Sequence, residues 1–104
     1  MGPEHLAGAE ASLRPGDILI IDTGSHLAAG TPAYDDHPAL SVAAARWIVD
    51  HEIKLLGVDT PTPDAPVKRR TQDFDYPVHR LLLGNGVLIA EQLTNLASLS
   101  GRRV

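Results

Sequence analysis

Apolar residues gather in short, separated runs along the chain, and each run predicts one element of regular structure. Residues 18–21 (ILII) form an unbroken aliphatic run, which is typical of a strand buried on both faces of a parallel sheet. Residues 55–58 (LLGV) and 87–90 (VLIA) predict two further strands. Between these runs, residues 41–51 and 77–83 carry apolar positions that predict two helices.

Both predicted helices have recognisable starts. Ser41 is a suitable N-cap for the first helix, and the alanines that follow favour helix strongly. Pro77 suits the first position of the second helix, where we expect Asp75 or Tyr76 to provide the cap. The second helix should stop at the Gly-Asn-Gly sequence of residues 84–86.

The predicted order of strand, helix, strand, helix, strand indicates an α/β class with mostly parallel pairing. The length of 104 residues fits a single domain, 1–104. Three strands form a narrow sheet whose two exposed edges invite pairing with another chain, so we expect a homo-oligomer or a partner chain. A complete small domain is the alternative.

The composition of the chain argues against several classes of function and site. Nine basic against 13 acidic residues give a net charge of −4, which argues against nucleic-acid binding. The chain has no cysteine, which excludes disulfides and thiolate zinc sites and fits a cytoplasmic protein. No apolar run approaches the length of a membrane span, and the start lacks the pattern of a signal peptide.

His79 and Glu91 are the candidate metal ligands. His79 lies on the second predicted helix and Glu91 directly after the third predicted strand, 91 − 79 = 12 positions later. A helix, a tight turn and a returning strand would bring an imidazole and a carboxylate together, and both suit Zn²⁺ or Mn²⁺. On spacing alone, a structural histidine and a solvated glutamate remain the alternatives.

Asp59, Thr62 and Asp64 are the candidate substrate-binding residues. They follow the second predicted strand in a proline-rich loop, and α/β proteins place their ligands at the carboxyl ends of parallel strands. The alternative is a turn in which these side chains hydrogen-bond the backbone.

Four segments in order resemble the cyclase family, which includes bacterial kynurenine formamidases, and together they span about residues 13–99. They are LRPGDILIIDTG (13–24), HPALS (37–41) with the helix after it, GVDTPTPD (57–64), and PVHRLLL (77–83) continuing to EQLTNL (91–96). The resemblance implies a swivelling β/β/α fold and metal-dependent hydrolysis of amide, formamide or lactone bonds in a small-molecule substrate. It also implies that His79 and Glu91 take the positions of late metal ligands.

The sequence departs from the family pattern in one segment and at three single positions. The family's HxGTHxDxPxH segment, which in the family supplies most metal ligands and a catalytic histidine, is not found in these 104 residues. Asp22 stands in place of the usual arginine and Ser25 in place of the usual tryptophan, while Thr62 stands where serine is usual and keeps a hydroxyl. We therefore expect no catalytic residue in this chain and a divalent metal, zinc or manganese, only where another chain completes the site.

Two functional interpretations follow. In the first, the chain is the second half of a metal-dependent hydrolase, inactive alone, and pairs with a chain that carries the missing half. In the second, it is a truncated, non-catalytic relic that acts as an oligomerising or small-molecule binding module.

Overall fold

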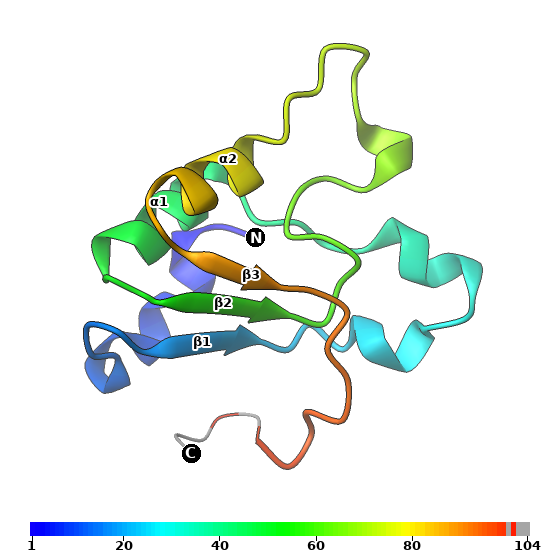
Figure 1. Cartoon of the computed structure of the whole chain (residues 1–104). Helices are drawn as coiled ribbons and strands as arrows, with labels where there is room; N and C mark the ends of the chain where they lie inside the picture. Colours follow the sequence, from blue (N-terminus) through cyan, green and yellow to red (C-terminus); the bar gives the residue numbers. More distant parts are fainter. Residues whose placement is uncertain (100, 102–104) are drawn as a thin grey trace.

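The structure, a computed structural model, describes residues 1–99 and 101. Strands β1 (Ile18–Ile21), β2 (Leu55–Val58) and β3 (Leu88–Ala90) form a parallel sheet in the order β1-β2-β3 (Figure 1). Helix α1 (Val42–Asp50) connects β1 to β2, and α2 (Pro77–Gly84) connects β2 to β3. The predicted α/β class, with three strands alternating with two helices, is confirmed.

The hydrophobic core lies between the sheet and the two helices, which pack against each other (Figure 1). A strand-helix-strand connection is almost always right-handed, so two successive connections that advance in one direction across a sheet place both helices on the same face. The fully buried side chains of this core come from α1, α2 and the central strand, and they include Ala44, Ala45, Ile48, Leu56 and Leu82.

The opposite face of the sheet is only partly covered. In the parallel register Ile18 lies beside Leu55, and Leu55 lies beside Leu88. Ile18 is 59 % exposed, Leu88 54 % and Ile20 41 %. The prediction that residues 18–21 are buried on both faces is therefore wrong, because both helices cover the same face.

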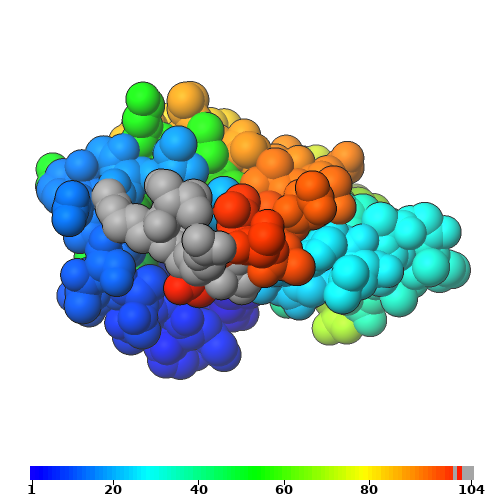
Figure 2. Space-filling model, turned by 90° about the horizontal axis from the view of Figure 1, so that it is seen from below, coloured from blue at the N-terminus to red at the C-terminus, as the bar shows by residue number. Residues whose placement is uncertain are grey.

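Part of the amino-terminal segment, in blue, and the last described residues, in red, lie on this second side of the molecule (Figure 2). Two 3-10 turns, Pro3–His5 and Ala7–Ser12, lie near Leu96 and Leu99, and together with β1 they line a surface hollow of about 820 Å³. Among the described residues, no helix is long and apolar enough to cross a membrane.

Candidate active site at the carboxyl edge of the sheet

An acidic residue follows each strand at the carboxyl edge of the sheet. Asp22 comes directly after β1, Asp59 after β2 and Glu91 after β3. A backbone hydrogen bond from Gln92 N to Thr60 O (2.9 Å) holds the end of β3 beside the end of β2. Parallel sheets bind their ligands at this edge, which makes it the candidate active site.

Asp64 caps the start of α2 from the loop that follows β2. Its carboxylate is buried and accepts hydrogen bonds from Val78 N (3.0 Å) and His79 N (2.9 Å). These N–H groups have no partner inside the helix, and a carboxylate near them also suits the helix dipole. Tyr76, at the N-cap position, has φ 55° and makes no capping hydrogen bond. Tyr76 therefore occupies the N-cap position as one of the two predicted residues, but the capping hydrogen bonds come from Asp64 and not from Tyr76 or Asp75.

Asp64 also orients the ring of His79 relative to Glu91. Nδ1 of His79 lies 2.7 Å from Oδ2 of Asp64, and Nε2 lies 3.4 Å from Oε2 of Glu91. When Nδ1 donates its hydrogen to Asp64, Nε2 presents a lone pair toward Glu91. Metal-binding histidines are commonly held by a carboxylate in this way. The structure thus brings the two predicted ligands together, with 23 % and 36 % of their side chains exposed.

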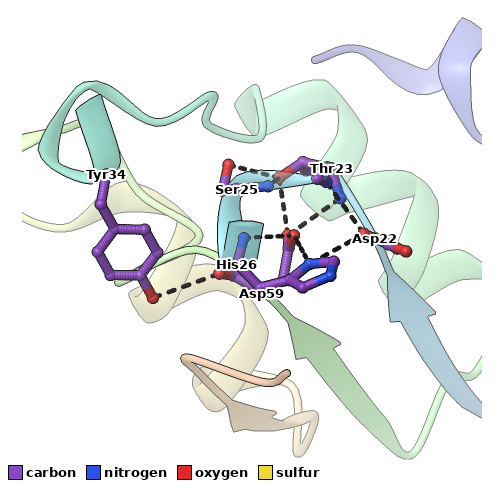
Figure 3. Close-up of polar contacts among 7 residues, drawn as sticks. Asp22, Thr23, Ser25, His26, Tyr34 and Asp59 are labelled. Carbon is purple, nitrogen blue, oxygen red and sulfur yellow. Dashed lines mark hydrogen bonds and ion pairs between the residues drawn. The ribbon is translucent and has the colours of Figure 1, made fainter. Parts of the chain in front are cut away.

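Asp59 ties the turn after β1 to the end of β2 (Figure 3). Its Oδ1 accepts hydrogen bonds from the backbone N (3.0 Å) and hydroxyl (2.7 Å) of Thr23. Its Oδ2 lies 3.2 Å from the backbone N and 2.9 Å from Nδ1 of His26. Burial alone raises the pKa of the Asp59 carboxyl, but these hydrogen bonds outweigh burial and hold the pKa well below its usual range.

The three residues predicted to bind substrate direct their polar groups at the protein. The carboxylates of Asp59 and Asp64 accept the hydrogen bonds just described. The Thr62 hydroxyl accepts a hydrogen bond from Asp64 N (3.1 Å), and the Thr60 hydroxyl donates to Thr62 O (2.8 Å). Side-chain hydrogen bonds therefore hold this loop in place, and substrate contact by these residues stays a prediction.

A second group of potential ligands, which was not predicted from the sequence, consists of Asp22, His26 and Asp59. One ligand atom from each residue lies within 4.8 Å of the other two. Asp22 could have been predicted, because it is the first carboxylate after an apolar strand, as Glu91 is. His26 gave no signal, because residues 22–38 have no periodic pattern and the histidine lies 33 positions before its partner Asp59.

The fold and the donor atoms at this edge define an α/β chain with side chains suited to a divalent metal. Residues 1–65, more than half of the chain, match the family Cyclase, described as "Putative cyclase". The chain belongs to the cyclase family.

Two relatives are known by function. Kynurenine formamidases of Bordetella pertussis (strain Tohama I) and Bordetella bronchiseptica (strain RB50) are each 35% identical over 78 residues, which cover 75% of this chain and 35% of the relative. The chain thus spans about a third of the length of these relatives.

A solved structure described as a potential metal-dependent hydrolase with cyclase activity has the same fold. It matches with a TM-score of 0.67 at 22% identity, over 92% of this chain and 44% of that chain. The cyclase-like fold is therefore shown for nearly the whole of this chain, including most of the part beyond residue 65.

Proposed function

We propose that this chain supplies one side of a divalent-metal site for the hydrolysis of amide, formamide or lactone bonds, with His79 and Glu91 as its metal ligands. The observation that carries the proposal is the position of His79, whose Nε2 faces Glu91 at 3.4 Å while Asp64 holds Nδ1. An imidazole and a carboxylate suit zinc or manganese. The two kynurenine formamidase relatives support this class of reaction.

Two protein ligands hold a metal weakly, since catalytic zinc usually takes three protein ligands and a water. The remaining ligands and the general base would come from a polypeptide that carries the HxGTHxDxPxH segment. The metal, when bound, would lower the pKa of a water toward ~7 and polarise the scissile carbonyl.

The chain's own residues position the site. Asp64 keeps the Nε2 atom of His79 aimed at Glu91. The loop that contains Asp64 is held beside Glu91 by the hydrogen bond from Gln92 N to Thr60 O. We assign the loop of residues 59–64 to the wall of the substrate pocket. In that role Asp59, Thr62 and Asp64 shape the wall through their hydrogen bonds.

The test is reconstitution with the separately purified first half of a cyclase-family protein that contains HxGTHxDxPxH. We expect the mixture, with Zn²⁺ or Mn²⁺, to hydrolyse an aryl formamide that neither chain hydrolyses alone. His79→Gln and Glu91→Gln should each abolish that activity. Asp64→Asn should weaken metal binding by roughly 10- to 100-fold, the usual effect of losing a carboxylate that orients a ligand histidine.

His5→Gln, at an exposed histidine of the first 3-10 turn, is the matched control and should leave activity unchanged. Sedimentation shows whether the two halves have formed a complex. A stable complex without hydrolysis, or full activity in His79→Gln, would contradict the proposal.

A further inference from the structure

Asp22, His26 and Asp59 form a group that shares no metal ligand with the proposed hydrolase site. Both carboxylates approach the same ring nitrogen of His26 (Figure 3): Oδ2 of Asp59 lies 2.9 Å from Nδ1, and Oδ1 of Asp22 lies 3.4 Å from it. An imidazole nitrogen carries at most one hydrogen, so a single well-aligned hydrogen bond accounts for only one of these two approaches.

The arrangement at His79 is different. There the two carboxylates lie on opposite ring nitrogens, with Asp64 on Nδ1 and Glu91 on Nε2. In that geometry one carboxylate orients the imidazole through one ring nitrogen, and the other ring nitrogen is available to bind a metal. At His26 both carboxylates lie on the same ring nitrogen, and one ligand atom from each of the three residues lies within 4.8 Å of the other two. Oδ1 of Asp22 also accepts a hydrogen bond from Gly24 N (3.0 Å), which holds it in this position.

The spacing of these atoms suits a transition-metal ion. Ligand atoms that surround zinc tetrahedrally at about 2.0–2.1 Å lie about 3.3 Å from one another. The separations of 2.9 and 3.4 Å from Nδ1 of His26 bracket that value, and all three atoms lie within 4.8 Å of one another.

The charge of the group also favours a cation. Asp59 is fully buried and Asp22 has 20 % of its side chain exposed. Within the described part of the chain, His26 is the only residue that forms an ion pair with either carboxylate. A neutral imidazole leaves a charge of −2 and a protonated one leaves −1, whereas a divalent cation neutralises the group. In the metal-free chain the hydrogen bonds to Asp59, and one from Gly24 N to Oδ1 of Asp22 (3.0 Å), stabilise these charges, and a bound cation would add to that stabilisation.

We propose that Asp22, His26 and Asp59 bind a divalent transition-metal cation, with Zn²⁺ or Mn²⁺ as the class, at a site separate from His79 and Glu91. Nδ1 of His26 coordinates the cation, and its hydrogen moves to Nε2 in the other neutral tautomer. Thr23 and the backbone of His26 keep their hydrogen bonds to Asp59.

The bound cation joins the turn Ser25–Ala28 to the end of β2, because His26 belongs to that turn and Asp59 follows the strand directly. The partly exposed side chains of His26 and Asp22 leave a path for the ion from solvent. Since binding favours the folded chain, saturating metal raises the Tm.

The test uses the tag-free double variant His79→Gln/Glu91→Gln, which removes the other candidate site. Calorimetric titration with Zn²⁺ and with Mn²⁺ should give one ion per chain, and metal should raise the Tm of this variant. Adding His26→Gln should abolish binding. Adding Asp22→Asn should weaken it by more than the roughly 10- to 100-fold that loss of an outer carboxylate causes. Adding His5→Gln should change nothing.

Equal binding with and without Asp22→Asn would overturn the proposal. So would a double variant that binds no ion, and in that case binding by the unaltered chain would still support the hydrolase site at His79 and Glu91. If His26→Gln fails to fold, Asp22→Asn decides, because it alters a partly exposed side chain and conserves its shape.

Discussion

Two histidines of this chain are held by aspartates in the same way. Oδ2 of Asp59 faces both the backbone N and Nδ1 of His26, and Oδ2 of Asp64 faces both the backbone N and Nδ1 of His79. A two-point contact of this kind fixes the position of the residue and the rotation of its ring. The loop of residues 59–64 therefore positions both candidate ligand histidines.

The Asp59 carboxylate should contribute stability that depends on pH. Its pKa is lower in the folded protein than its ordinary value of 3.8, so the charged form stabilises the fold. That contribution is present in full above the pKa of the unfolded chain and is lost as the pH falls through the folded pKa. We expect Asp59→Asn to lower the free energy of unfolding at pH 7 by about 2–3 kcal/mol, because buried donors lose a charged acceptor.

Urea denaturation at a series of pH values from 7 to 3, in metal-free buffer, measures this effect. Below about pH 4 the unaltered chain should lose stability, and the deficit of Asp59→Asn relative to it should shrink. Asp35→Asn, at an exposed position, should change stability by less than about 0.5 kcal/mol. A deficit that stays constant over the whole pH range would contradict a role of the Asp59 charge.

The sequence predicted some of the candidate residues but not the residues that they contact. Asp59 and Asp64 were found because a carboxylate after an apolar strand is conspicuous, but the expected partner was a substrate, and the observed partners are His26 and His79. Those partners lie 33 and 15 positions away. Pairing at such a distance depends on how the loops fold back, which no local pattern records.

At the scale of elements, the sequence predicted more. The helix predicted at 41–51 is α1, Val42–Asp50, and the Ser41 side chain accepts a hydrogen bond from Ala44 N as an N-cap should. The three segments that form strands could be predicted from their short apolar runs, because such runs are local signals. The faces of β1 were not predicted correctly, because coverage depends on where both helices pack.

Gly57, in the middle of β2, shows how an element and the site depend on each other. A Cβ atom there would lie 2.7 Å from Cδ1 of Leu93 and 3.3 Å from Cγ1 of Ile20. Alanine normally strengthens a strand relative to glycine, but here it would displace the Leu93 side chain near Glu91. We expect Gly57→Ala to lower the free energy of unfolding by about 1 kcal/mol.

Gly8→Ala is the matched control, because a Cβ atom at Gly8 meets no atom within 4 Å. It should be neutral or slightly stabilising. Urea denaturation of both variants makes the comparison. Equal stability of the Gly57→Ala and Gly8→Ala variants would show that close packing at Leu93 does not matter.

At the scale of the whole molecule, the sheet has one face covered by helices and one face with exposed apolar side chains. The described chain gives two reasons to expect a partner on the second face. Ile18 and Leu88 are more than half exposed, and β1 and β3 are edge strands. Exposed apolar surface of this kind marks interaction sites.

We therefore expect the purified chain to self-associate through this face when no other partner is present. Sedimentation should show a dimer or larger species, and Ile18→Lys/Leu88→Lys should shift it to monomer without unfolding, because both side chains are largely exposed. Val67→Lys, which replaces a 75 % exposed apolar side chain away from the sheet, should leave the assembly unchanged. A folded monomer at high concentration, or equal dissociation by Val67→Lys, would show that the sheet face does not mediate assembly.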